Sequence, residues 1–219
     1  MREVELAAGD VVHEPGDVVE QVYFPLTAVI GLMTVTAGAP EVEGMAVGQE
    51  GLVGLAAVLG DGTSPHRAVV QVPGRAVRLP AAALRGLFDL EPTCRRLLGQ
   101  YTQTMIVLLS QRVACSQRHT AQQRCADWLL RHADRVGTEP IPVTQQFLAA
   151  MLGLRRTTVS AIAAHLQASG LITYRYGRVV VRDHSGLERL ACACYRVFRD
   201  QMRRLTTTAT TPPDPPLPT

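Results

Sequence analysis

The segment Thr144–Ile162, TQQFLAAMLGLRRTTVSAI, constrains the fold more than any other part of the chain. Its spacing fits two short helices that share one apolar core, with the small Ala149 where the helices would cross. Gly153 falls in the turn between them, where the backbone needs a positive φ. The shared apolar positions are Leu148, Leu152, Leu154, Val159 and Ile162. This pattern predicts a helix-turn-helix, because an ordinary helical hairpin would not account for the arginines at the start of the second helix.

The second helix of such a motif places its first residues in the major groove of DNA. Here these residues include Arg155 and Arg156, and an arginine can donate to both O6 and N7 of guanine, which is worth about 1–3 kcal/mol of discrimination. Arg155 stands where Ser, Thr or Asp would normally cap the helix, so a phosphate oxygen could take the place of the missing capping bond. We therefore expect base contacts from Arg155, Arg156, Thr157 and Ser160, and phosphate contacts from Thr144, Gln145 and Thr158.

Two short strand patterns follow the helix-turn-helix. Gly170 would end the second helix, and residues 171–181, LITYRYGRVVV, read as two strands around a basic turn. A hairpin in this place is a wing, in which Arg175 and Arg178 would lie along the DNA backbone. Such phosphate contacts add affinity with a steep salt dependence and carry no sequence information.

The charge of the chain is divided between its two halves. Residues 1–90 carry 5 Arg against 11 Asp and Glu, whereas residues 140–205 carry 10 Arg against 3 acidic residues. Residues 1–80 also contain 11 of the 18 glycines, and their short β-branched runs between Gly and Pro turns predict an antiparallel sandwich or barrel. The asymmetry indicates a nucleic-acid-binding module joined to a domain of another kind.

A long helix is predicted from Pro92, because proline suits the first turn of a helix. A stripe recurs along it at steps of three and four for about three heptads, which is typical of a helix that pairs with another helix. The stripe begins at Cys94, is widened by Leu97 and Leu109, and has six main positions, which are Leu98, Tyr101, Met105, Leu108, Arg112 and Cys115. We expect it to be the seam of a dimer; the alternative is a helix that lies on its own β domain.

Thr120 can cap a further helix that runs to Val136, so residues 118–120 are the expected hinge. The last 14 residues contain 6 Thr and 5 Pro with a single charge and are expected to be disordered. We therefore divide the chain into a β domain (1–90), a dimerisation helix (91–118), a DNA-binding domain (119–205) and a disordered tail (206–219).

The five cysteines are expected to be reduced, because their odd number and irregular spacing do not fit a secreted disulfide framework. Cys192 and Cys194 lie near His184, but two thiols two positions apart on a helix would point to different sides, so no metal site is expected. The histidines lack the grouping of a cupin-like metalloenzyme and no catalytic motif is present, which argues against an enzyme. No apolar run is long enough to cross a bilayer and no signal peptide is apparent, so we expect a cytoplasmic protein.

With these features the chain resembles the cyclic-AMP receptor protein and fumarate/nitrate regulator (Crp/Fnr) family of bacterial transcription factors, over residues 1 to about 205. The resemblance rests on Pro15-Gly16-Asp17 ahead of Val22-Tyr23-Phe24, on residues 48–55 (GQEGLVGL), on the long helix and on residues 152–160 (LGLRRTTVS). It implies an α+β fold: a cyclic-nucleotide-binding-type β-roll (jelly roll), a dimerisation helix and a winged helix-turn-helix. It further implies a homodimer on near-palindromic operators in double-stranded DNA, with RNA polymerase as a further partner. A regulatory subunit whose β-roll gates a partner protein is the alternative, against which the winged helix argues.

The resemblance also places an effector pocket at Gly54, Leu55, His66 and Arg67. The family's cyclic-nucleotide site has a glutamate that binds the ribose and an arginine that neutralises the phosphate. Here Leu55 replaces the acid and His66 aligns with the arginine, while Arg67, one residue later in a strand, turns to the other face. Ordinary cyclic AMP is therefore not expected. An iron–sulfur cluster is not expected either, because no cysteine precedes Cys94, and the effector stays unidentified.

Overall fold

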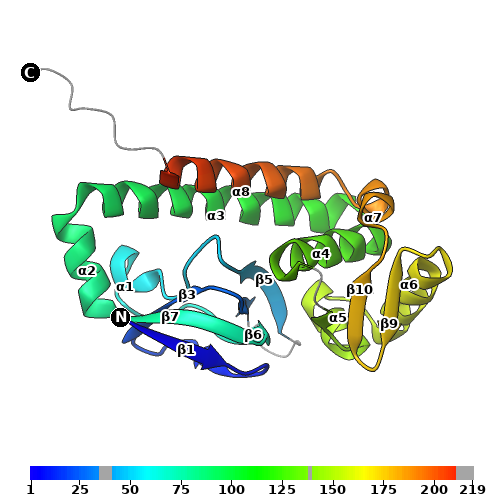
Figure 1. The fold of residues 1–219 in the computed structure, drawn as a ribbon, viewed down its shortest axis with the longest axis horizontal. Helices are drawn as coiled ribbons and strands as arrows, with labels where there is room; N and C mark the ends of the chain where they lie inside the picture. The colour runs from blue at the N-terminus through cyan, green and yellow to red at the C-terminus, as the bar shows by residue number, and fades with distance from the viewer. Residues whose placement is uncertain (35–40, 138–139, 211–219) are drawn as a thin grey trace, which may run out of the picture.

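The computed structural model of the protein describes residues 1–34, 41–137 and 140–210, and for residues 208–210 it describes the backbone only. The fold is α+β, with a β-roll at one end and a winged helix-turn-helix at the other (Figure 1). Two long helices, α3 (Pro92–Arg118) and α8 (Cys194–Thr210), run side by side along one flank of both parts. No single helix in these ranges is both long and apolar enough to span a membrane.

Two antiparallel sheets build the β-roll. The first has the strand order β2-β6-β4-β5 and the second the order β1-β7-β3. Their facing sides bury an apolar core that includes Ile30, Val47 and Val70. Two helices, α1 (Ala56–Leu59) and α2 (Ala81–Leu90), complete the domain. The strands are β1 (Arg2–Leu6), β2 (Val11–His13), β3 (Gln21–Pro25), β4 (Val29–Thr34), β5 (Val42–Val47), β6 (Arg67–Val72) and β7 (Gly74–Pro80).

The second half of the chain packs its helices and a small sheet around Trp128 and Leu148. Thr120 caps the first of these helices, as predicted, and it exchanges hydrogen bonds with Gln123 in a capping box. The sheet has the order β8-β10-β9. The elements are α4 (Ala121–Val136), β8 (Ile141–Pro142), α5 (Gln145–Leu152), α6 (Arg156–Ala168), β9 (Ile172–Arg175), β10 (Arg178–Val181) and α7 (His184–Leu190).

Helix α3 is packed against its own chain, so the predicted dimer seam is wrong for most of its residues. Four of the six positions are at most 7% exposed in the single chain, namely Leu98, Tyr101, Leu108 and Cys115, while Met105 and Arg112 are half-buried. A heptad stripe indicates that one face of a helix is buried, and here that face of α3 is covered by the β-roll and α8. The exposed large apolar residues of α3 are Ile106, Leu109 and Val113, and of these only Leu109 belongs to the predicted stripe, at its edge.

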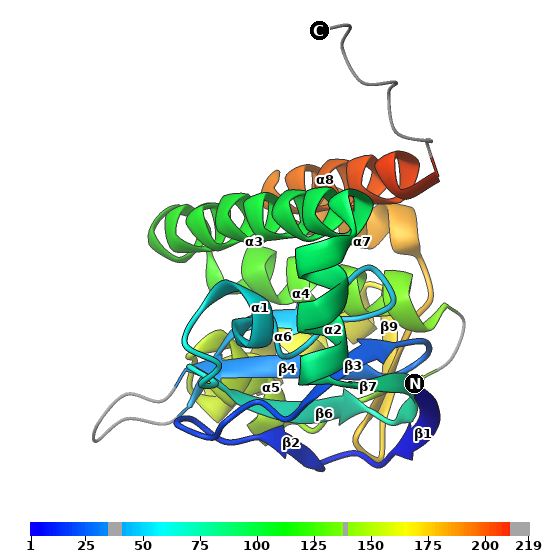
Figure 2. The ribbon, with the colours of Figure 1, turned by 90° about the vertical axis from the view of Figure 1, so that its left-hand side faces the viewer.

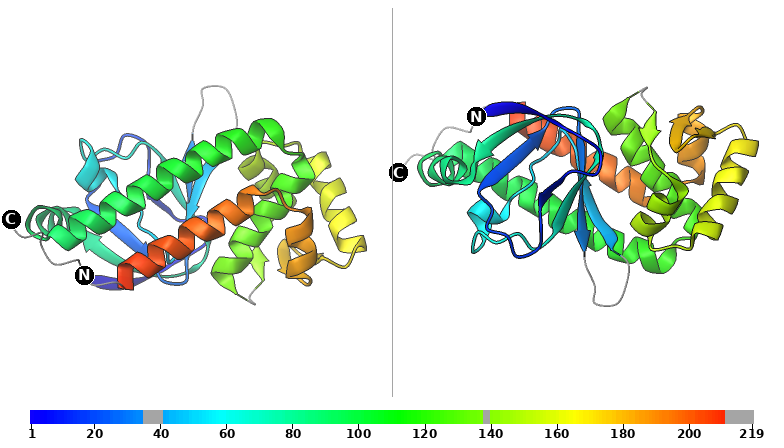
Figure 3. Two further views of the ribbon diagram at one scale, coloured as in Figure 1. Left: turned by 90° about the horizontal axis from the view of Figure 1, so that it is seen from above. Right: turned by 90° about the horizontal axis from the view of Figure 1, so that it is seen from below.

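Helix α8 corrects the prediction of a disordered tail from residue 206, because it continues to Thr210. It runs antiparallel to α3 (Figures 1 and 3), and seen from the side both helices lie above the sheets of the β-roll (Figure 2). Tyr195, Phe198, Met202 and Leu205 recur at the helical spacing of three and four and give it an apolar side, which is buried at the first two residues and half-buried at the last two. Residues 211–219 of the predicted tail lie outside the described residues.

A buried polar network joins the β-roll to α3 and α4. Glu43 is 2% exposed and accepts hydrogen bonds from Gln71 Nε2 (2.8 Å) and Trp128 Nε1 (3.1 Å). Its second oxygen lies 3.4 Å from Arg112 Nη1. Burial raises the pKa of Glu43, but Arg112 and the hydrogen bonds outweigh burial and leave the pKa lowered. His132 completes the network, with its ring stacked on Trp128 and its Nε2 3.0 Å from Gln71 Oε1.

We predict that the protein loses stability as the pH falls from 7 to 5, because His132 is buried as a neutral ring. Burial lowers the pKa of His132 from its ordinary 6.5 to about 4. As the pH falls, His132 is therefore protonated in the unfolded chain before it is protonated in the folded one. The unfolded state then binds more protons over this window, which lowers the free energy of unfolding by about 2 kcal/mol. Urea titrations at both pH values measure the loss.

The comparison with His132→Gln isolates this residue, since the two proteins share their other ionisable groups. The variant should show a smaller loss of stability than the wild type between the two pH values. Equal pH dependence in both proteins would contradict the prediction.

Candidate nucleic-acid interface

Helices α5 and α6 form the predicted helix-turn-helix and are bent by 111° at their junction. Gly153 ends α5 with a φ of +62°, the left-handed conformation that its place in the sequence predicts. Leu148, Leu152 and Val159 are buried in the shared core, and Leu154 is half-buried against it. The core thus holds the first turn of α6 in a definite orientation.

The beginning of α6 carries exposed positive charge. Arg155 occupies the N-cap position without a side-chain capping bond, as predicted, and Arg156 follows it. Both are exposed, together with Thr157 and Thr158. The ion pairs of the described residues involve other arginines. Guanidinium groups that lie at the positive end of a helix dipole and have no carboxylate partner attract an anion such as a DNA phosphate.

A groove of about 420 Å³ opens between α6 and the wing. Thr144, Gln145, Arg156 and Ser160 line it, so the structure brings these predicted residues together. The Ser160 hydroxyl donates to Gln145 Oε1 at 2.6 Å, which ties α6 to α5 instead of leaving Ser160 free to face a base.

Thr144 caps α5, and its hydroxyl oxygen accepts a hydrogen bond from the Phe147 amide at 3.1 Å. The hydroxyl group can still donate its own hydrogen, because a threonine oxygen both accepts and donates. A phosphate at the start of α5 would find this donor in place, as the sequence predicts.

The wing is formed by β9 and β10, which pair Arg175 with Arg178 across a two-residue turn. Both turn residues have a positive φ, 50° for Tyr176 and 70° for Gly177, as type I′ hairpin turns require. The turn projects a fully exposed Tyr176 beside the two exposed arginines. Tyr176 also lines the groove, and sequence reasoning missed it although its position before a glycine in a hairpin was a usable signal.

Apart from the groove beside α6, the β-roll contains a cavity of about 500 Å³ that is mainly apolar. Gly54, Leu55 and His66 line it, as the family resemblance implies. Arg67 does not: it pairs with two glutamates at 3.2 and 3.3 Å, which fits the expectation that it turns to the other face of the strand. Among the described residues that line the cavity, none is an arginine.

Two histidines face this cavity. Burial lowers the pKa of both His13 and His66, so both rings are neutral at pH 7. His13 Nε2 lies 2.9 Å from the Gln21 carbonyl oxygen, whereas His66 Nδ1 is buried without a hydrogen-bond partner among the described residues. The apolar walls, the neutral polar groups and the carboxylate of Asp61 suit a ligand without negative charge better than a cyclic phosphate.

Two family models match the chain, the cyclic nucleotide-binding domain over residues 3–91 and the Crp-like helix-turn-helix domain over residues 123–190. Among solved structures, FixK2 from Bradyrhizobium japonicum aligns with a TM-score of 0.73 and 18% identity, covering 88% of this chain and 98% of its own. The Crp/Fnr-family transcriptional regulator TTHA1359 from Thermus thermophilus aligns with a TM-score of 0.70 and 24% identity, covering 87% of this chain and 98% of its own. No curated protein sequence matches.

A third structure, the c-di-GMP responsive global regulator CLP of Xanthomonas campestris, aligns with a TM-score of 0.60 and 17% identity, covering 82% of this chain and 93% of its own. TTHA1359 is thus described as a transcriptional regulator and CLP as a global regulator. The two matched domains follow each other in the order that the sequence predicts, joined by α3. The chain therefore belongs to the Crp/Fnr family of transcriptional regulators.

Proposed function

We propose that the protein is a homodimeric, sequence-specific DNA-binding regulator whose β-roll takes an effector without negative charge. The observation that carries the proposal is the start of α6, where Arg155 and Arg156 are exposed, with no carboxylate partner in the described part of the chain, beside a groove and a basic wing. Such a surface complements both phosphates and guanine edges. Since its partner would be DNA, we place the protein in the cytoplasm; contact with RNA polymerase stays a prediction of the family.

The exposed apolar face of α3 supports the dimer. Ile106, Leu109 and Val113 are 60%, 43% and 67% exposed, and their spacing places them on one side of the helix. Pairing with the same face of a second copy would remove this apolar surface from water. A two-fold dimer would present two α6 helices to two half-sites about one helical turn apart, which suits a near-palindromic operator.

Leu109 can couple effector binding to the dimer contact, because it lies on the exposed face of α3 and also lines the β-roll cavity. An effector that binds one arrangement of the two chains more tightly than another would shift the balance between them. The break between α3 and α4 at His119 and Thr120 is the pivot on which the DNA-binding parts would turn.

Arg156→Glu should weaken operator binding at least about tenfold, because it removes a bidentate guanine contact and adds repulsion from phosphates. An operator is first selected from a random DNA pool with the wild-type protein and then titrated by fluorescence anisotropy. The control is Arg2→Glu, which makes the same charge change at an exposed position of the β-roll. Equal affinity of Arg156→Glu and wild type would overturn the proposed function.

Arg178→Ala should weaken binding to the selected operator and to random DNA by similar factors, because a wing arginine contacts the backbone. The slope of log affinity against log salt should become shallower by about 1. Arg2→Ala should leave the slope unchanged. A loss confined to the selected operator would contradict a backbone role for Arg178.

Val113→Asp should shift the protein toward monomer, because it places a charge in the apolar face of α3. Sedimentation equilibrium measures the dissociation constant of the dimer. Val18→Asp provides a matched control, since Val18 is 73% exposed and belongs to the β-roll instead of α3. If Val113→Asp and wild type have the same dissociation constant, α3 is not the dimer contact.

A further inference from the structure

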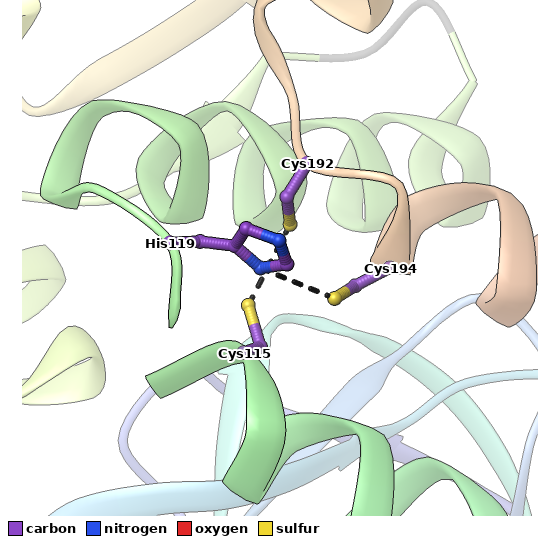
Figure 4. Close-up of side chains that lie close together, drawn as sticks. All are labelled: Cys115, His119, Cys192 and Cys194. Atoms are coloured by element: carbon purple, nitrogen blue, oxygen red, sulfur yellow. Dashed lines mark hydrogen bonds between the residues drawn. The ribbon is translucent and has the colours of Figure 1, made fainter. Parts of the chain in front are cut away.

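Four side chains able to bind a metal meet where α3 ends and α8 begins (Figure 4). They are Cys115, His119, Cys192 and Cys194, and one ligand atom of each lies within 4.8 Å of every other. Cys115 is in the last turn of α3 and His119 is its C-cap residue. Cys194 is the first residue of α8, and Cys192 lies in the connection that precedes it.

The structure corrects the expectation that no metal site forms here. Cys192 and Cys194 do not share one helix, on which their thiols would point to different sides. Cys192 is outside α8, so both sulfur atoms can turn toward the end of α3 (Figure 4). Cys115, 77 residues before Cys192, enters the group only through the antiparallel packing of α3 and α8.

The spacing of the ligand atoms fits a single tetrahedral ion. The sulfur atoms of Cys115 and Cys192 are 3.5 Å apart, and Cys194 Sγ lies 3.5 Å from His119 Nδ1. With Zn–S bonds of about 2.3 Å and Zn–N bonds of about 2.0 Å, neighbouring ligands of tetrahedral zinc are separated by about 3.5–3.8 Å. Three cysteines and one histidine make a closed set of the structural zinc type.

One neighbouring side chain suits a metal-bound thiolate. Gln111 Nε2 donates to Cys194 Sγ at 3.1 Å, a hydrogen bond that orients this sulfur from outside the ligand set. The three cysteines are buried, whereas His119 is half-buried and therefore reachable from solvent. An ion could therefore enter at His119.

We propose that Cys115, His119, Cys192 and Cys194 form a tetrahedral site for one zinc-type divalent ion. The site lies outside the DNA-binding surface and the β-roll cavity, and it goes beyond the proposed function. Because its ligands come from both ends of the DNA-binding part, the ion joins the α3–α4 break to the start of α8. Such a link stabilises the folded chain by the free energy of metal binding.

Zinc content of the full-length protein tests the proposal. Wild-type protein is purified with reductant, incubated with Zn²⁺, desalted and analysed for metal, and we expect one Zn²⁺ per chain. Cys192→Ser should weaken zinc binding at least about tenfold. Cys94→Ser is the matched control, because Cys94 lies outside the ligand set at the other end of α3, and it should keep the full zinc content.

Cobalt binding provides a readout of the ligands themselves. Co²⁺ in a tetrahedral thiolate site should give intense visible bands and sulfur-to-metal charge transfer, and His119→Gln should shift these bands. His119 is half-buried, so this variant keeps the packed core even if Cys192→Ser does not fold. Arg156→Glu should bind Zn²⁺ as the wild type does, which separates this test from that of DNA binding.

The proposal is overturned if wild-type protein takes up no Zn²⁺, or if Cys192→Ser and His119→Gln bind it as tightly as the wild type. A Cys115–Cys192 disulfide without reductant, with no Zn²⁺ uptake after its reduction, would identify a redox pair and would also overturn it. Such a bond would require the two sulfur atoms to approach from 3.5 Å to about 2.05 Å.

Discussion

The placement of the DNA-binding part against the β-roll depends on one buried carboxylate, that of Glu43. Its partners come from three elements: Gln71 from β6, which is separated from the strand of Glu43 by β4, Arg112 from α3 and Trp128 from α4. A buried charge that loses its partner costs about 3–5 kcal/mol, so an arrangement that separates these groups without replacing them is disfavoured. The two parts of the chain can rearrange only if water or a new partner reaches this carboxylate.

A second buried pair acts at the same boundary. Glu50, from the segment GQEGLVGL, pairs with Arg135 of α4 at 2.6 Å, and Arg135 also donates to the Ala46 carbonyl at 2.9 Å. Both pairs run from an acidic residue of the β-roll to an arginine of a helix. The charge asymmetry of the sequence therefore also acts within one chain, because two of the acidic residues of the β-roll form ion pairs with arginines of helices α3 and α4. The arginines of α6 and the wing are not involved in it.

Features that depend on neighbours in sequence could be predicted, and features that depend on distant partners could not. Gly153 and Thr120 were recognisable because a turn and a cap need a particular residue at a particular local position. The α3 stripe showed that Leu98 and Leu108 are buried, but the same spacing arises whether the covering surface belongs to one chain or to two. The Glu43 network and the four metal ligands depend on how separate segments meet. The spacing of residues along the sequence did not show that α8 runs back antiparallel along α3.

That return has a consequence for motion. The DNA-binding part is attached to α3 twice, through the break at Thr120 and through α8, whose Leu205 packs in the same cluster as Leu98. A body held at one point can swing in many directions, but one held at two points can turn only about the line between them, unless α8 slides along α3. In the proposed dimer, the motion that would change the separation of the two α6 helices is therefore restricted to rotation about this line. The last turns of α8, which pack beside the β-roll, are the second point that fixes this axis.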